Sequence, residues 1–358
     1  MSFKGKILIV GGYGVVGKII SSTLGNLYPK KIMVAGRNYQ KAKDLATELN
    51  QKVIPLKLDI SSISENDNLL NSISLVIMCI DQKDITFVTQ CIKRGVNYID
   101  ITANYNFLSK IESLNDLAKK HNSTVVLSIG LAPGLTNLLA KRSKEIVENV
   151  QFANIYILLG LGEKHGNASY SWTFNDFNDE FFVNENGKKI RVKSFEDGKQ
   201  TLFPEIIGKR TAYRSNFSDQ HVIPKTLEIK SVSTRMCFDS AFMTKLYALI
   251  KKTFIRKLFK LESVQDLLIN TFKIFKFGTD QFALKVDAGL NQNDGALFEC
   301  SIIGNGQGKI TGLVASKVAE KLLTTSFEKG VYHIEQLFDS ITFINELNNI
   351  FEYKEKKF

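Results

Sequence analysis

Cysteine is scarce in this sequence, and the few cysteines lie far apart. The four are Cys79, Cys91, Cys237 and Cys300, and no two of them form a C-x-x-C pair. This spacing argues against a zinc site or a redox dithiol. It also suits a reducing compartment, because disulfide frameworks belong to oxidising ones. We therefore expect a cytoplasmic protein with no bound metal.

Long apolar runs are also missing. No stretch reaches the ~18 residues that a membrane-spanning helix needs, and the first residues lack the apolar region and cleavage site of a signal peptide. The composition, 44% hydrophobic and 23% charged, is that of a globular protein. The length of 358 residues predicts two domains, each large enough for its own core.

Positive charge exceeds negative charge, with a net charge of +11. Such a protein can bind nucleic acid, an anionic membrane or an anionic small molecule. The sequence contains no nucleic-acid-binding motif, and its lysines are spread along the whole chain. We therefore expect no nucleic-acid partner, and we interpret the charge as suited to cofactor phosphates, substrate carboxylates and a solvated surface.

The N-terminal region contains a strand, a glycine-rich loop and a helix in immediate succession. Residues 6–10 are a short apolar run typical of a buried parallel strand, and residues 18–24 have a helical pattern. Between them, Gly12, Gly14 and Gly17 fit the pattern G-x-G-x-x-G. The three glycines permit a tight turn, close approach of a pyrophosphate and close packing of helix on strand. This context predicts a dinucleotide-binding loop, and the alternative is a flavodoxin-like sheet.

The alternation of strands and helices continues to about residue 130. Further strands are expected at 32–35, 53–58, 75–80, 96–100 and 124–128, with helices at 40–49, 84–94 and 107–121. Strands that alternate with helices imply a parallel sheet covered on both faces. The fold class is therefore α/β, with a Rossmann doubly wound parallel sheet in residues 1–132.

The end of the second expected strand bears on the choice between NAD(H) and NADP(H). NAD-binding proteins usually place an Asp or Glu there to hold the ribose 2′-hydroxyl, whereas this chain has Arg37 and Asn38. The Arg37 guanidinium can hold a 2′-phosphate, with Lys41 near in sequence, so we expect NADP(H) to be preferred over NAD(H). Alternatively, Arg37 stacks on the adenine or caps the loop. Asp59 contacts the adenine or acts as an N-cap.

The expected cofactor contacts come from the glycine loop and from the ends of the second, third and fourth strands. They are Gly12, Tyr13, Gly14, Val15, Val16, Gly17, Arg37, Asn38, Asp59, Cys79 and Ile80.

Several of these motifs together resemble the saccharopine dehydrogenase-like oxidoreductases. The motifs are the glycine loop at 12–17, Ala35-Gly36-Arg37, and the segments 76–80, 95–100 and 129–137. The last of these, G-x-x-P-G-x-x-N, is the most specific. The resemblance weakens further along the chain, at 168–173, at Arg214 and at 306–323. It implies a substrate-pocket tryptophan at Trp172 and a substrate-carboxylate arginine at Arg214.

The sequence departs from the family at one point. The glutamate-forming saccharopine reductases carry an aspartate in the segment that here reads Leu131-Ala132-Pro133. This departure puts saccharopine itself in doubt as the substrate. The resemblance implies hydride transfer between NADP(H) and a C–N bond of an amino-acid-derived substrate.

After residue 132 the pattern changes to one dominated by strands and loops. We expect a substrate and dimerisation domain at 133–305, with an α+β fold and an open mixed sheet, and residues 306–358 packing back on the first domain. Strands are expected at 153–159, 190–195, 226–232, 281–288 and 296–303, and helices at 135–147, 240–260, 264–275 and 310–323. A homodimer through this sheet is the expected assembly.

The chemistry also needs a proton donor and cations for carboxylates. Tyr98 and Asp100 end the fifth strand, where ligands of such sheets bind, and Asp100 is a candidate general acid. Alternatively, Asp100 only bonds the next loop. Trp172 is the only tryptophan and forms a pocket wall or packs in a core. Arg214 binds a carboxylate or lies solvated in a loop.

Two histidines and a basic segment complete the candidates. His165 and His221 lie in expected loops and either relay protons or are merely solvated. Residues 251–260 read as a basic amphipathic helix, which lies on an anionic membrane or, as we favour, packs on the protein surface with its lysines in water.

Two further functions remain open. One is reduction of C=C or C=O on a lipid-like substrate by an enoyl or carbonyl reductase. The other is a dinucleotide-binding protein without turnover.

Overall fold

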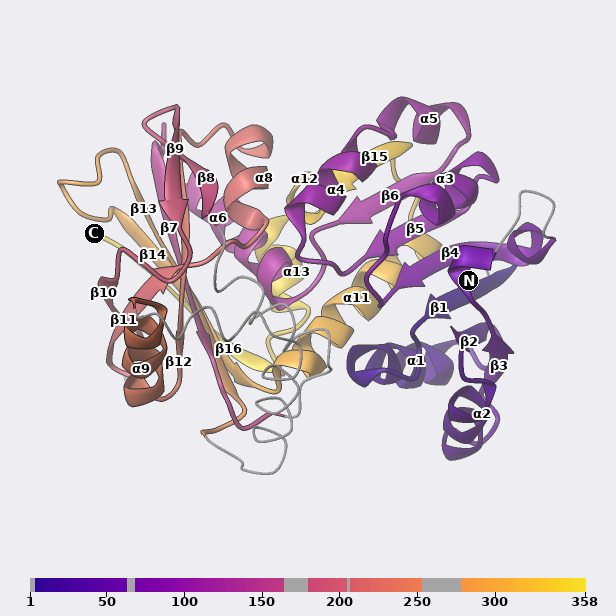
Figure 1. The fold of residues 1–358 in the computed structure, drawn as a ribbon. Helices are drawn as coiled ribbons and strands as arrows, with labels where there is room; N and C mark the ends of the chain where they lie inside the picture. The colour runs from indigo at the N-terminus through magenta and orange to yellow at the C-terminus, as the bar shows by residue number, and fades with distance from the viewer. Residues whose placement is uncertain (1–3, 63–67, 164–179, 205–206, 253–277) are drawn as a thin grey trace. The chain divides into compact units, whose positions relative to one another are not determined.

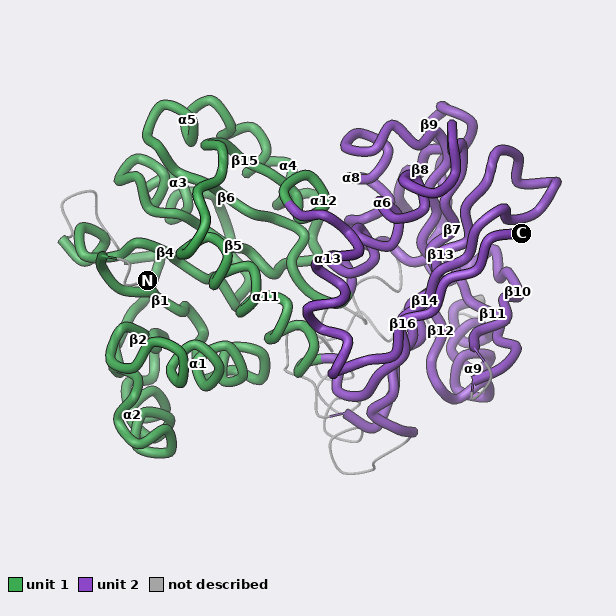
Figure 2. Tube along the Cα trace, turned by 180° about the vertical axis from the view of Figure 1, so that it is seen from behind, with its two compact units in different colours: residues 1–131, 308–337 green, residues 132–307, 338–358 purple. Residues whose placement is uncertain are grey.

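The computed structural model describes residues 4–62, 68–163, 180–204, 207–252 and 278–358. These residues form two compact units (Figure 2). Unit 1 contains residues 1–131 and 308–337, and unit 2 contains residues 132–307 and 338–358. The fold is α/β, with a parallel sheet in unit 1 and a mixed sheet in unit 2, which confirms the expected fold class.

Unit 1 is a seven-stranded sheet in the order β15-β6-β5-β4-β1-β2-β3. Every pairing in it is parallel. Its strands are β1 Lys6–Val10, β2 Ile32–Gly36, β3 Val53–Lys57, β4 Ile73–Met78, β5 Asn97–Asp100, β6 Thr124–Leu127 and β15 Gly330–His333. The first six strands have the Rossmann order 3-2-1-4-5-6. β15 extends the sheet beyond β6.

Helices connect the strands of unit 1. They are α1 Val15–Leu27, α2 Tyr39–Glu48, α3 Thr86–Lys93, α4 Tyr105–Glu112, α5 Asn115–Lys120, α11 Gln307–Thr324 and α12 Ile334–Leu337, with short 3-10 turns η1 Ile60–Ser62 and η2 Leu69–Ser72. One continuous core lies between α3, α4, α5 and the sheet face that carries Leu8, Val76 and Tyr98. Ile7 and Ile9, on the opposite face, are also buried, so both faces of the sheet are covered.

Unit 2 is built on a mixed sheet in the order β10-β11-β12-β7-β13-β14-β16, with the β8–β9 hairpin attached to β12 (Figure 1). Its strands are β7 Phe152–Leu159, β8 Glu180–Glu185, β9 Lys188–Lys193, β10 Lys199–Leu202, β11 Lys209–Arg214, β12 Ser231–Phe238, β13 Gln281–Gly289, β14 Phe298–Asn305 and β16 Phe351–Lys357. Its helices are α6 Thr136–Ile146, α8 Asp219–Thr226, α9 Ala241–Lys252 and α13 Ser340–Asn345. β7 and β12 are parallel, and the other pairings are antiparallel.

The G-x-x-P-G-x-x-N segment leads into α6. Gly134 has a φ of +135°, which L side chains rarely adopt. The side-chain oxygen of Asn137 accepts a hydrogen bond from the Gly134 backbone nitrogen at 3.1 Å, and Asn137 is buried. The glycine and the asparagine of this motif therefore fix the turn that precedes the helix.

Some elements differ from those expected. Residues 219–226 form α8, and the strand expected at 226–232 begins only at Ser231. The expected helix at 107–121 is divided into α4 and α5. Residues 338–358 were expected on the first domain, yet β16 pairs with β14 of unit 2. Alternating charges and few apolar residues in β16 gave its sequence little resemblance to a strand.

Candidate functional site: a dinucleotide loop and a buried carboxyl

The glycine-rich loop follows β1 directly and starts α1. Gly11 has a φ of +77°, and the Gly14 nitrogen donates to the Gly11 oxygen at 2.9 Å. A Cβ on Gly17 would lie 2.2 Å from the Gly11 oxygen, so only glycine allows α1 to approach the loop this closely. No side chain caps the first turn of α1, where Val15 and Val16 lie, so this turn suits a pyrophosphate.

The end of β2 carries Gly36, Arg37 and Asn38. Asn38 caps α2, since its side-chain oxygen accepts from the Lys41 nitrogen at 3.1 Å. Its own backbone nitrogen donates to the Tyr13 hydroxyl at 3.1 Å. Arg37 is exposed. No carboxylate occupies the last position of β2 or the two positions that follow it. Arg37 is therefore the only charged residue of these three, and its charge is positive.

Asp59 lies after β3 and caps a short turn. Its carboxylate accepts hydrogen bonds from both the backbone nitrogen and the hydroxyl of Ser61 at 3.0 and 2.7 Å. These bonds, with help from Arg37, lower the pKa of Asp59. The turn is η1, so Asp59 is engaged as the N-terminal cap that was one of the two interpretations of its sequence.

Cys79 and Ile80 follow β4 and border the glycine loop. The Cys79 nitrogen donates to the Val10 oxygen at 2.9 Å. A Cβ on Gly11 would lie 2.5 Å from Cγ2 of Ile80, so Ile80 packs against the loop. Burial raises the pKa of the Cys79 thiol, which keeps it neutral.

Asp100 ends β5 and is the most perturbed carboxyl of unit 1. Its Oδ2 accepts from the Tyr98 hydroxyl at 2.9 Å and from Nε2 of Gln82 at 3.0 Å. Its Oδ1 accepts from the Thr102 nitrogen at 2.9 Å. Burial outweighs these bonds and raises the pKa of Asp100 to about 7, so the carboxyl exchanges its proton near neutral pH. Gln82 was not found from the sequence, because only the fold places it beside Tyr98.

A second buried polar chain ends β6. The Ser128 hydroxyl lies 2.8 Å from Nδ1 of His333, and Nε2 of His333 lies 3.2 Å from Glu112. Ser128 and His333 are buried, and the chain of contacts links the ends of β6 and β15. His333 lies 205 residues from Ser128 in sequence, and no local pattern indicates their contact.

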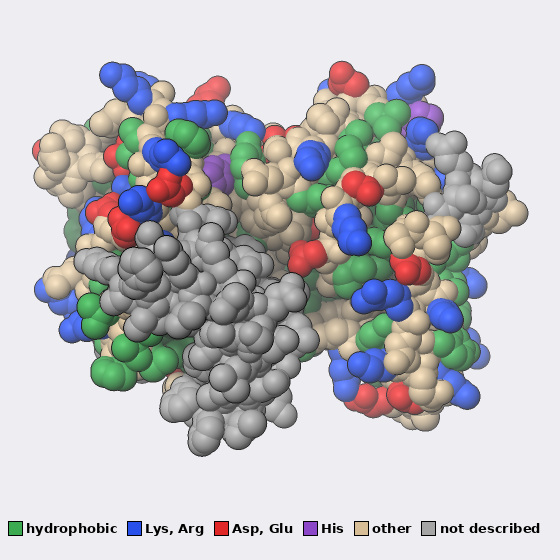
Figure 3. All heavy atoms as spheres, in the orientation of Figure 1, with side chains coloured by type: hydrophobic (Ala, Val, Ile, Leu, Met, Phe, Trp, Pro, Cys, Tyr) green, Lys and Arg blue, Asp and Glu red, His purple; other side chains and the backbone are tan. Residues whose placement is uncertain are grey.

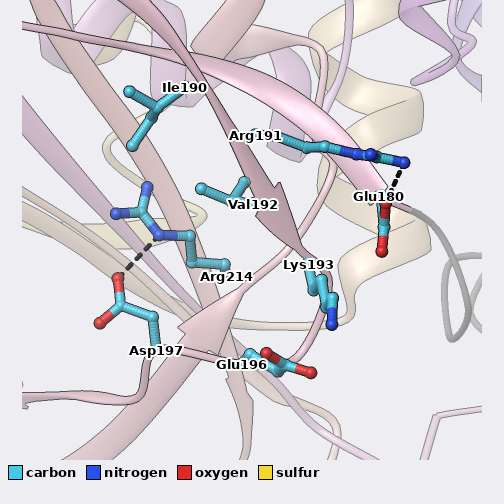
Figure 4. A pocket seen from close by; sticks show the side chains of 8 residues that line it. All are labelled: Glu180, Ile190, Arg191, Val192, Lys193, Glu196, Asp197 and Arg214. Carbon is cyan, nitrogen blue, oxygen red and sulfur yellow. Dashed lines mark hydrogen bonds and ion pairs between the residues drawn. The ribbon is translucent and has the colours of Figure 1, made fainter.

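Arg214 of unit 2 lies in a network of charges rather than in a solvated loop (Figure 4). It ends β11, and its Nε donates to Asp197 at 2.8 Å. Its Nη2 donates to Glu185. Arg235, on β12, donates to the same Asp197 oxygen at 2.6 Å. Burial raises the pKa of Asp197, but the two arginines outweigh it and lower the pKa.

An open hollow of about 560 Å³ lies beside this network, lined by Glu180, Ile190, Arg191, Val192, Lys193, Glu196, Asp197 and Arg214. Among the described residues, Nη1 of Arg214 is buried and has no hydrogen-bond partner. Nη1 of Arg214 therefore keeps its two N–H donors for a further group.

The remaining candidates are the histidines and Trp172. Trp172 and His165 lie outside the described residues, as does most of 251–260. His221 lies in α8, and its Nε2 is 2.7 Å from the Asn216 side-chain oxygen. Burial, with Lys225 and Lys189, lowers the pKa of His221 to about 4, so it is neutral at pH 7 and unsuited to relay protons there.

The described parts of the chain hold no cluster of three or more His, Cys, Asp or Glu side chains that could bind a metal ion. None of their helices is long and apolar enough to cross a membrane. Lysine and arginine side chains are scattered over the face of the protein drawn in Figure 3 and form no single stripe.

Comparison with known proteins finds a similar family model for part of unit 1 and similar folds for most of the chain. Residues 7–126 match the family model of the saccharopine dehydrogenase NADP binding domain. The saccharopine dehydrogenase (L-Glu forming) of Saccharomyces cerevisiae superposes with a TM-score of 0.70 and 16% identity, over 99% of this chain and 100% of that chain. The amine dehydrogenase of Mycobacterium smegmatis gives a TM-score of 0.48 and 9% identity, over 93% and 96%. A search of curated proteins found no match.

The strand order of unit 1 and its glycine loop are those of a dinucleotide-binding Rossmann domain. More particularly, residues 7–126 are similar to the NADP binding domain of saccharopine dehydrogenases. The resemblance seen in the sequence motifs is thereby confirmed for this domain. At 16% identity the structural likeness concerns the fold alone.

Proposed function

We propose that this protein is an NADP(H)-dependent oxidoreductase that transfers hydride at a C–N bond of an amino-acid-derived substrate. The observation that carries the proposal is the end of β2, where an exposed Arg37 follows Gly36 and no carboxylate is present. A carboxylate there would repel a 2′-phosphate, whereas a guanidinium can bind it with two parallel hydrogen bonds. The choice of a C–N bond rests on the family resemblance.

The glycine loop would hold the pyrophosphate of the cofactor. Gly12, Gly14 and Gly17 place no side chain at their own positions, and the uncapped first turn of α1 offers backbone N–H groups to the phosphates. The cofactor supplies the hydride, while the protein supplies position and electrostatics. Cys79 and Ile80 border the loop and would line the same site.

Asp100, assisted by Tyr98, is the proton donor that we propose. A group that gives a proton to a substrate nitrogen near neutral pH needs a pKa close to that pH. The pKa of Asp100, raised to about 7 by burial, meets this condition. Tyr98 and Gln82 both donate to Oδ2 of Asp100, so they would orient the carboxyl and support its ionised form after the proton has left.

Arg214 and Trp172 remain the proposed substrate contacts. Two of the three guanidinium nitrogens of Arg214 are engaged by Asp197 and Glu185, and Nη1 is the one with a donor to spare. A substrate carboxylate would therefore be held by Nη1 alone rather than by two nitrogens of the fork. We further propose a cytoplasmic homodimer that binds a small-molecule substrate.

The test is a titration of the full-length protein with NADPH and NADH, followed by nicotinamide fluorescence. We expect tighter binding of NADPH. NADPH oxidation is then screened with amino acids paired with 2-oxo acids or aldehydes. Binding of neither cofactor would contradict the proposal. NADPH binding without turnover on any pair would favour a non-catalytic dinucleotide-binding protein.

A further inference from the structure

The side chain of Tyr13 reaches from the glycine loop to the end of β2. A Cβ on Gly36 would lie 2.4 Å from the Tyr13 hydroxyl oxygen and 2.6 Å from two ring carbons. The same hydroxyl accepts a hydrogen bond from the Asn38 nitrogen at 3.1 Å. The hydroxyl therefore lies against both residues that flank Arg37.

The hydroxyl of Tyr13 has a proton to donate. A phenol accepts with its lone pairs and donates one O–H. Its bond with Asn38 uses only a lone pair, because a backbone nitrogen is the donor. The described residues include no acceptor for the Tyr13 proton. The Tyr13 side chain is partly exposed, so the proton is available to a ligand.

The charge around the hydroxyl favours an anion. Arg37 is exposed and forms no ion pair with any of the described residues. Asp59, the carboxylate that interacts electrostatically with Arg37, is engaged by Ser61. In a Rossmann fold the group next to the end of the second strand is the adenosine ribose 2′-position. A neutral donor lies against both chain neighbours of a permanent cation, at the end of β2 where a 2′-phosphate would bind.

We propose that the Tyr13 hydroxyl donates a hydrogen bond to the 2′-phosphate of NADP(H) and, with Arg37, determines the preference for NADP(H). This inference rests on the proposed dinucleotide-binding function. Tyr13 is held in place before the ligand arrives, by the space above Gly36 and by the Asn38 nitrogen, so little conformational entropy is lost on binding. The hydroxyl is a specificity-determining group and takes no part in hydride transfer.

Calorimetry with adenosine 2′,5′-bisphosphate and with 5′-AMP tests this role, because the two probes differ only in the 2′-phosphate. In Tyr13→Phe the ring stays over Gly36 and only the hydroxyl is lost. We expect bisphosphate binding to weaken about tenfold or more, as for a lost hydrogen bond to a charged group, while binding of 5′-AMP is unchanged. The ratio of NADPH to NADH affinity should fall by the same factor.

Tyr28→Phe is the matched control. Tyr28 follows α1, just before β2 begins, so it lies near the amino end of β2, whereas the glycine loop lies near its carboxyl end. Both probes should therefore bind this variant as they bind the unchanged protein. An unchanged ratio in Tyr13→Phe, or an equal loss of both probes, would overturn the role of the hydroxyl. If the unchanged protein binds no dinucleotide at all, the proposed function itself fails.

Discussion

The ring of Tyr13 lies so close to Gly36 that a Cβ at position 36 would be 2.4 Å from the tyrosine oxygen. The two residues are 23 positions apart and belong to different βα turns. The glycine at the end of β2 is thus explained by a side chain of the glycine-rich loop. Arg37 follows at once, and its role leads to the first prediction.

Arg37→Ala should weaken NADPH binding by about 10- to 100-fold, because a charge-assisted pair with the 2′-phosphate is lost. NADH, which lacks this phosphate, should bind as before. Fluorescence titrations with both cofactors measure the effect. Lys43→Ala, which removes an exposed cation from the same region, is the control. A ratio of affinities that Arg37→Ala leaves unchanged would remove the phosphate role.

Substitution of two glycines of the loop should have different effects, one on stability and the other on cofactor binding. A Cβ on Gly17 would meet the Gly11 oxygen at 2.2 Å, whereas one on Gly14 would meet only the same oxygen at 3.2 Å. Gly17→Ala should therefore lower the free energy of unfolding by about 1–3 kcal/mol. Gly14→Ala should keep most of its stability and lose cofactor affinity, since the pyrophosphate must come close. Thermal unfolding measures the stability of both variants, and NADPH titration measures their affinity for the cofactor. Equal stabilities of the two variants would contradict the prediction.

Asp100 should make the protein less stable as pH rises. Its pKa is about 7 in the fold and about 4 in an unfolded chain. Between these values the folded state binds more protons than the unfolded state, so stability falls with rising pH, by roughly 2–4 kcal/mol in total from this group. In Asp100→Asn this part of the pH dependence should vanish.

Urea unfolding at pH 4.5 and pH 8 measures the effect in the unchanged protein and in Asp100→Asn. Asp59→Asn is a suitable control, because the pKa of exposed Asp59 is lowered rather than raised. Identical pH dependences in the unchanged protein and Asp100→Asn would show that Asp100 is ionised throughout.

Arg235 should matter to the stability of unit 2 far more than Arg191 does. Arg235 has a side-chain exposure of 6% and binds Asp197, while Arg191 has an exposure of 69% and pairs with Glu180. Arg235→Met removes hydrogen bonds to the Ser233 hydroxyl and to the carbonyl and carboxylate of Asp197, and should cost about 1–3 kcal/mol. Arg191→Met should change stability by less than about 0.5 kcal/mol. Chemical unfolding of both variants tests the contrast, and equal losses would refute it.

The elements whose signals are local could be predicted from the order of residues. The strand at 6–10, the glycines at 12, 14 and 17 and the start of α1 follow one another within about a dozen positions. The six parallel strands could be predicted because each is a short apolar run between helical segments. The absence of a carboxylate after Gly36 could likewise be read directly.

The contacts between side chains that are far apart in the sequence could not be predicted and depend on the fold. Gln82 donates a hydrogen bond to Asp100, and the Asn38 nitrogen donates one to Tyr13. His333 forms a hydrogen bond with Ser128. The pKa of Asp100 depends on burial, which no residue type reveals. Arg214 looks like a loop cation in the sequence, but the fold surrounds it with carboxylates. A sequence pattern describes residues that are neighbours along the chain. Burial and side-chain pairing depend on contacts between distant segments, and these segments come together only when the chain folds.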